Sequence, residues 1–111
     1  MPNNDFFKIV YQILYYLYDV KKEGRVLNVD EINHEAFGIP YSYYADIISE
    51  LMDNGLIKGA IVKPTKTTRI LCLNDMYITM KGIEYLQENS MMKKTYKILK
   101  ELKDWTPIYK K

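Results

Sequence analysis

The stretch that most constrains the fold is residues 39–59, which reads as an amphipathic helix, a turn and the start of a strand. Pro40 stands near the first turn of this helix and Gly55 just after its end, the usual placing of these two residue types. At about 100° per residue, one helix face collects Tyr41, Tyr44, Ala45, Ile48, Leu51 and Met52, and the opposite face collects Tyr43, Asp46, Glu50 and Asp53. The first face is predicted to lie in the core and the second to meet a partner.

The residues before this stretch predict supporting helices. Residues 5–22 form a helix that is apolar on most of its circumference, so it is buried on more than one side. One side faces the core, and the other needs a C-terminal helix or a second subunit. Residues 28–38 form a shorter helix, with a capping-box pattern at Asn28 and Glu31 and a stop at Gly38. A short strand is predicted at residues 26–27. The short helix, a tight turn and the longer helix make a helix-turn-helix.

The residues after it predict a hairpin and further helices. Residues 56–63 are rich in strand-forming residues, residues 64–68 are a polar tip, and residues 69–73 return, with extended structure resuming at 76–78. Thr79 caps a helix that ends near residue 89, and a further amphipathic helix spans about 91–103. The predicted fold is therefore α+β: one winged helix-turn-helix domain over residues 1–111, with an additional C-terminal helix and a tail from about residue 104.

Charge is distributed unevenly along the chain. Residues 26–57 contain six acidic residues and no Lys or Arg, whereas residues 58–111 contain twelve basic and five acidic residues, a net charge of +7. The single cysteine cannot form an internal disulfide, which fits a reducing cytoplasm. The apolar runs are shorter than a membrane span, and the start of the chain lacks the basic region of a signal peptide. A cytoplasmic protein without membrane partners is expected.

The residues that usually carry catalysis are scarce. The chain has one histidine, His34, expected on an exposed helix face, and one cysteine, Cys72, expected as a small buried apolar residue of a strand. No His or Cys cluster has metal-ligand spacing, and the glycines form no phosphate-binding loop. The sequence therefore predicts a protein that is not an enzyme and that holds no metal or cofactor.

Three stretches carry a resemblance to a known family. The segments ADIISELMDNGLIKG (residues 45–59) and YITMKGIEYLQEN (residues 77–89) resemble the helix-to-wing and strand-to-last-helix parts of winged-helix proteins. Together with the start DFFKIVYQILYYL (residues 5–17), the chain resembles the YjcQ family, small winged-helix proteins of Gram-positive bacteria and their phages. The resemblance implies the fold and the setting. The wider winged-helix class mostly binds DNA, and this is an analogy at the level of the fold.

Two kinds of partner follow from these observations. Duplex DNA would meet the first turn of the third helix and the hairpin, through Tyr41, Ser42, Tyr43, Lys63, Lys66, Thr67 and Arg69, in a regulator-like protein of bacterial or prophage origin. The acidic outer face departs from the usual recognition helix, because carboxylates repel phosphates. The alternative is a protein-interaction module that uses Tyr43, Asp46, Glu50 and Asp53. A homodimer through the first and C-terminal helices is compatible with either.

Overall fold

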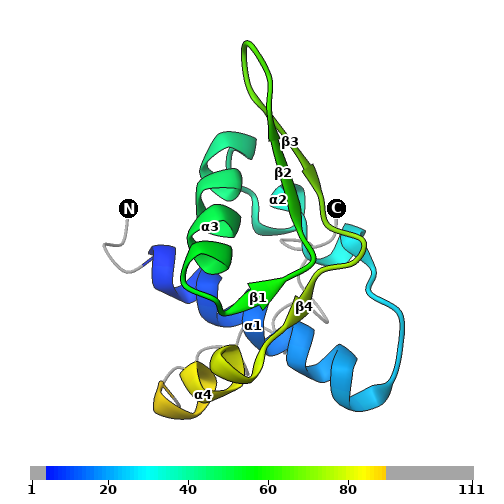
Figure 1. Cartoon of the computed structure of the whole chain (residues 1–111). Helices are drawn as coiled ribbons and strands as arrows, with labels where there is room; N and C mark the ends of the chain where they lie inside the picture. Colours follow the sequence, from blue (N-terminus) through cyan, green and yellow to red (C-terminus); the bar gives the residue numbers. More distant parts are fainter. Residues whose placement is uncertain (1–4, 90–111) are drawn as a thin grey trace.

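A computed structural model describes residues 5–89 (Figure 1). Within them the fold is α+β, with four α-helices, one 3-10 helix and two small antiparallel sheets, an arrangement compatible with a winged helix-turn-helix. The elements are α1 (Asp5–Glu23), η1 (Val29–Glu31), α2 (His34–Phe37), α3 (Tyr41–Asp53), β1 (Ile57–Lys58), β2 (Ile61–Pro64), β3 (Arg69–Cys72), β4 (Tyr77–Ile78) and α4 (Met80–Glu88). The predicted helix at 91–103 and the tail lie outside the described residues. None of the helices within residues 5–89 has the length and apolar character needed to cross a membrane.

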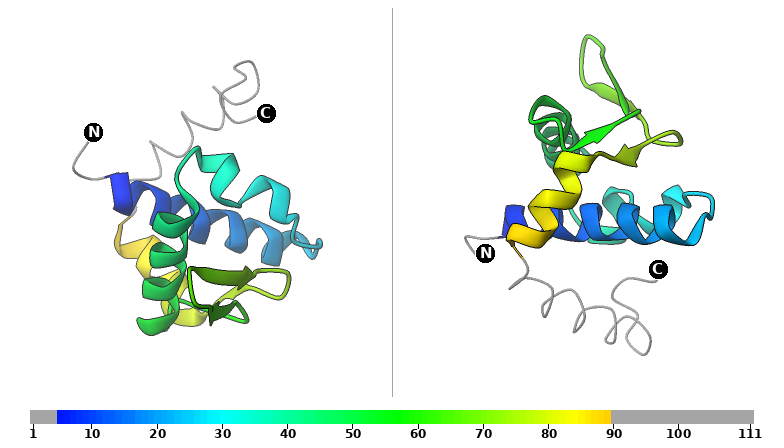
Figure 2. Two further views of the ribbon diagram at one scale, coloured as in Figure 1. Left: turned by 90° about the horizontal axis from the view of Figure 1, so that it is seen from above. Right: turned by 60° about the horizontal axis from the view of Figure 1, so that its bottom comes forward.

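Helix α1 is confirmed and forms the base on which the other elements pack. It contacts α3, α4 and β4, and in the right-hand view of Figure 2 it runs below α3 and β4, while α4 descends to its level. Ile13 and Leu14, neighbours in the sequence that point to different sides of the helix, are completely buried. More than one side of α1 is therefore buried, as expected for a helix that is apolar on most of its circumference.

The predicted second helix is broken into two pieces, η1 and α2. The Asn28 side chain accepts from the backbone N–H of Asp30, so the full capping box with Glu31 is not formed. Asn33 then starts α2 by accepting from the N–H of Ala36 at 2.9 Å. Because an Asn side chain competes with helical backbone hydrogen bonds, Asn33 starts a new helix and the first one does not continue. Residues 26–27 form no strand.

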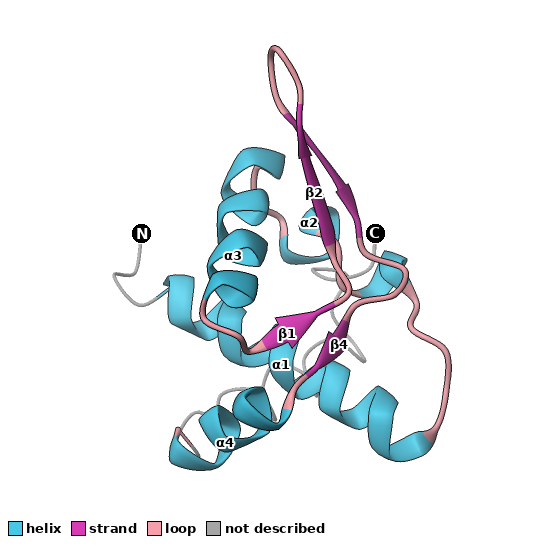
Figure 3. Ribbon diagram, viewed as in Figure 1, coloured by secondary structure: helices cyan, strands magenta, loops and turns pink. Residues whose placement is uncertain are grey.

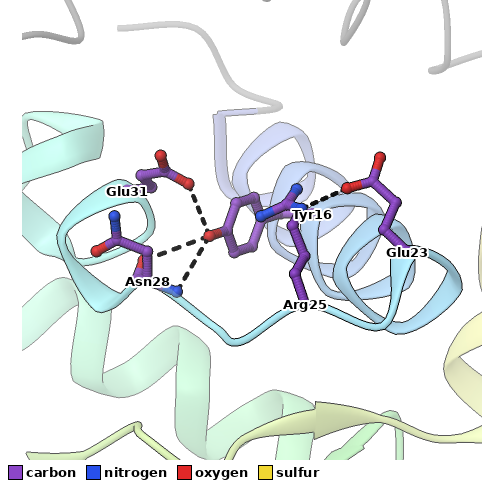
Figure 4. A network of polar contacts seen from close by, with 5 residues as sticks. All are labelled: Tyr16, Glu23, Arg25, Asn28 and Glu31. Carbon is purple, nitrogen blue, oxygen red and sulfur yellow. Dashed lines mark hydrogen bonds and ion pairs between the residues drawn. The ribbon is translucent and has the colours of Figure 1, made fainter.

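A polar network fastens the loop between α1 and η1 (Figure 4). The Tyr16 hydroxyl donates to Glu31 Oε1 at 2.8 Å and accepts from the N–H of Asn28 at 3.3 Å. The Arg25 guanidinium pairs with Glu23 and lies 5.6 Å from the centre of the Tyr16 ring. Burial, and then the hydrogen bond to Glu31, raise the pKa of Tyr16. The start of η1 is thereby fixed to α1.

The predicted continuous strand at 56–63 is also broken, and this break separates the two sheets (Figure 3). Gly59 has a φ of 88°, which turns the chain so that β1 pairs with β4 and β2 pairs with β3. Residues 74–75 form a turn between β3 and β4. Thr79 caps α4 as predicted, accepting from the N–H of Gly82 at 3.1 Å, and its hydroxyl donates to the carbonyl of Gly55 at 2.6 Å. The β2–β3 hairpin is left projecting beyond the N-terminal end of α3 (Figure 1).

Candidate functional site

The β2–β3 hairpin and the first turns of α3 are joined by one arginine. Arg69, at the start of β3, forms an ion pair from Nη2 to Asp46 Oδ1 at 2.8 Å and donates from Nη2 to the carbonyl oxygen of Ser42 at 3.1 Å. The Arg69 side chain is 32% exposed and the Asp46 side chain 60% exposed. The hairpin and the N-terminal part of α3 therefore form one continuous surface. Arg69, predicted to contact DNA, and Asp46, predicted to contact a protein, pair with each other.

Tyr41 makes a second link between the same two elements. Its hydroxyl accepts from the backbone N–H of Leu71 in β3 at 2.8 Å. Its ring meets the ring of His34 edge-on, with 5.1 Å between the ring centres. His34 is half-buried, so its predicted full exposure is wrong; Tyr41 covers it from the next helix. Tyr41 therefore acts mainly as an internal contact that holds the hairpin.

The hairpin tip is closed by its own threonines. The N–H of Thr65 donates to the carbonyl of Thr68 at 2.6 Å, and the N–H of Thr68 donates to Thr65 Oγ1 at 3.0 Å. This closure leaves Lys66 and Thr67 exposed at the apex of the turn. Lys63, one residue before Pro64, is exposed on β2.

The register of the hairpin decides which side chains face away from α3. Opposed residues share a face in an antiparallel pair. The pairs Ile61–Cys72 and Lys63–Ile70 therefore lie on the outer face, and Val62–Leu71 and Pro64–Arg69 lie on the face toward α3. Cys72 is exposed, so the prediction that it is buried is wrong. The apolar neighbours of Cys72 in the sequence suggested a core strand, but this strand alternates between a half-buried and an exposed face.

The acidic face of α3 divides into two parts. Asp46 is paired with Arg69, whereas Glu50 and Asp53 are exposed and form no ion pair within the described residues. Glu50 accepts only a long contact of 3.4 Å from Asn54. Tyr43, predicted on the same face, is half-buried, with its ring centre 6.3 Å from that of Phe6 in α1. The unpaired carboxylates thus lie toward the C-terminal end of α3, away from the hairpin tip.

A double-mutant cycle measures the link between hairpin and helix. Asp46→Asn and Arg69→Gln are each expected to destabilise the fold slightly, with a coupling energy of about 0.5 kcal/mol, because the pair is partly exposed. Chemical denaturation of the two single variants and the double variant gives this coupling. Glu50→Gln is the matched control and should show no coupling to Arg69→Gln. Equal coupling for both carboxylates would mean that the pair has no specific role.

Of the predicted contact residues, Ser42, Lys63, Lys66 and Thr67 remain exposed on this surface. The sequence did not predict the ion pair between Arg69 and Asp46. It also did not predict the hydrogen bond from the Leu71 amide to the Tyr41 hydroxyl. The only signal of the ion pair in the sequence was the opposite charge of the outer face of α3 and of the strand that returns after the hairpin tip. Within residues 5–89, no cluster of three or more His, Cys, Asp or Glu side chains is placed to hold a metal ion.

Comparison with known proteins places the chain in a family. The model of the family described as YjcQ protein matches residues 11–105, which is most of the chain, so the chain belongs to the YjcQ family. The comparisons with curated proteins and with solved structures gave no match.

Proposed function

We propose that this YjcQ-family protein is a winged helix-turn-helix protein that binds duplex DNA through the hairpin tip and the first turn of α3. The observation that carries the proposal is the Arg69 bridge to Asp46 and Ser42, which holds the hairpin against the N-terminal part of the helix. A basic loop and a helix N-terminus held side by side are what backbone binding to a duplex requires.

The cations available for phosphates are Lys63 and Lys66. Both are exposed, and neither forms an ion pair within the described residues. Thr67 lies beside Lys66 at the apex and offers a neutral hydroxyl. Each lysine that meets a phosphate releases a counterion, which makes affinity fall with salt.

The N-terminus of α3 supports contact with a phosphate. Pro40 occupies the N-cap position and provides no side-chain hydrogen bond to the first turn. Helix N-termini bind phosphate through their N–H donors and the helix dipole. The exposed Ser42 hydroxyl lies in this turn.

The remaining carboxylates limit how the duplex is approached. At a rise of about 1.5 Å per residue, Asp53 lies about 16 Å along the axis from Ser42. A duplex laid along all of α3 would meet Glu50 and Asp53 and be repelled. The proposed contact therefore uses the N-terminal end of α3 and the hairpin, is dominated by the backbone, and has little sequence preference. A regulatory role in a bacterium or prophage would need a further specificity element.

The test is a double charge reversal at the tip. Lys63→Glu with Lys66→Glu is expected to weaken binding to a duplex of about 20 base pairs by about a hundredfold, and to reduce the salt slope by about 2. Fluorescence anisotropy across a salt series measures both. The control is Lys58→Glu with Lys81→Glu, which makes the same charge change at two exposed lysines away from the hairpin tip. Equal losses in both double variants, or no binding by the unaltered protein at low salt, would overturn the proposal.

The unpaired Glu50 and Asp53 favour a second candidate, a protein-interaction module. A basic partner segment would bind this end of α3 through the two carboxylates. Reversing Glu50 and Asp53 to Lys should abolish binding to a basic model peptide while leaving DNA binding at least as strong as in the unaltered protein. The homodimer through α1 and the C-terminal helix stays a prediction.

A further inference from the structure

A pocket of about 300 Å³ lies where the helix-turn-helix meets the root of the hairpin. Its walls come from η1, α2 and the start of α3 on one side, and from β3 and the turn after it on the other. The volume is at the lower end of the range for small-molecule sites, about 300–1,000 Å³. A cavity of roughly half this size, about 150 Å³, holds benzene, so this pocket has room for one or two fused rings.

The apolar part of the pocket is formed by Val29, Leu71, Leu73 and the ring of Tyr44. The Tyr44 hydroxyl is already used, because it donates to the carbonyl of Ile32. Tyr44 and Leu73 are buried, so these walls are held in place by the core. A flat ring can pack against them.

Several hydrogen-bonding groups in the pocket remain available. The Tyr41 hydroxyl accepts from Leu71, so its own proton is free to be donated. The Asn33 side-chain oxygen caps α2, which leaves its amide N–H₂. His34 Nδ1 lies 3.4 Å from the carbonyl of Ile39; when it donates there, Nε2 remains as an acceptor. Cys72 and Asn74 complete the polar rim.

The charge of the lining restricts the ligand. None of the nine described residues around the pocket is Lys, Arg, Asp or Glu. A charged ligand would lose hydration there without gaining a counter-charge, which is unfavourable. A neutral ring with both donor and acceptor atoms matches the donors of Tyr41 and Asn33 and the acceptor of His34.

We propose that this pocket binds a small neutral heteroaromatic molecule of one or two rings, held between the helix-turn-helix and the root of the hairpin. The inference does not depend on DNA binding. Because Tyr41 lines the pocket and also fastens Leu71, a bound ring would contact both elements that the Arg69 bridge joins.

Cys72 lines the pocket and is exposed, and its side chain lies on the outer face of the hairpin, so a linker that passes the free edge of β3 can carry a probe from the thiol into the pocket. The Cys72 thiol exchanges with a disulfide probe, forming a mixed disulfide and releasing the other half of the probe as a thiol. The first probe carries benzimidazole on a linker long enough to pass this edge, and matched probes carry tert-butyl or a carboxylate on the same linker. The concentration of reductant that removes half of the benzimidazole label should be about tenfold higher than the concentration that removes half of either matched label. Mass spectrometry of the intact protein gives the labelled fraction.

Two variants show whether the preference comes from the pocket. His34→Ala and Asn74→Ala should each reduce the benzimidazole preference by at least about threefold, and Lys63→Ala on the same hairpin should leave it unchanged. Circular dichroism checks the fold; Asn74 lies in an exposed turn, so its variant tests the pocket even if His34→Ala fails to fold. Equal labelling by benzimidazole and tert-butyl, equal labelling by the carboxylate, or a preference that neither variant changes would overturn the proposal.

Discussion

Gly59→Ala is expected to lower the free energy of unfolding by about 3 kcal/mol or more. Gly59 has a φ of 88°, in the region that favours glycine, so any side chain there is strained. An added Cβ would also lie 2.0 Å from the carbonyl oxygen of Asp75 and 2.9 Å from its carbon. Both are backbone atoms of the turn before β4, so they cannot move without disturbing the pairing of β4 with β1.

Gly24→Ala is the matched control for this prediction. Gly24 also has a positive φ, 66°, but no heavy atom lies within 4 Å of an added Cβ. Only the backbone strain remains, so the expected loss is about 1 kcal/mol. Urea denaturation followed by circular dichroism compares the two variants. Similar losses in both would mean that the close approach to Asp75 is relieved in solution and that β1 and β2 need no fixed break between them.

The break at Gly59 also shows a limit of strand prediction. Residues 56–63 have the composition of one strand, and composition does not reveal which partner each half will pair with. The order of elements was predictable because helix signals are local: Pro40 and Gly55 bracket α3, and Thr79 caps α4. Asn33 is an equally local signal of a helix start. It was outweighed by the apolar spacing of the segment around it, which favoured one continuous helix.

The candidate surface was predictable in position but only partly in detail. Lys63, Lys66 and Thr67 are exposed at the hairpin, as a polar tip between two strands implies. Arg69 pairs with a residue 23 positions earlier in the chain, and nothing local in the sequence indicates that contact. The pocket is likewise lined by four separate segments of the chain. The sequence could not predict it, because it depends on the position of the hairpin against α3.

Ile47→Ala gives the second large effect, an expected loss of about 3 kcal/mol. Ile47 is completely buried, although the predicted core face of the helix omitted it. The helix is covered by α1 on one side and by the strands on another, so a wider stripe is buried than one flat face provides. Alanine favours helix more than isoleucine does, so lost packing accounts for the whole decrease.

Met52→Ala is the comparison, because Met52 was predicted in the core and is only half-buried. Its expected loss is about 1 kcal/mol, since part of the side chain is already in water. Thermal or chemical denaturation ranks the two variants. An equal or larger loss of stability in Met52→Ala would support the core face predicted from the sequence, which includes Met52 and omits Ile47. It would mean that Ile47 is not enclosed as described. If Ile47→Ala is the more destabilising variant, α3 is packed on two sides. A partner can then reach only one exposed strip of the helix, formed by Ser42, Asp46, Glu50 and Asp53. Arg69 already contacts the part of that strip nearest the hairpin.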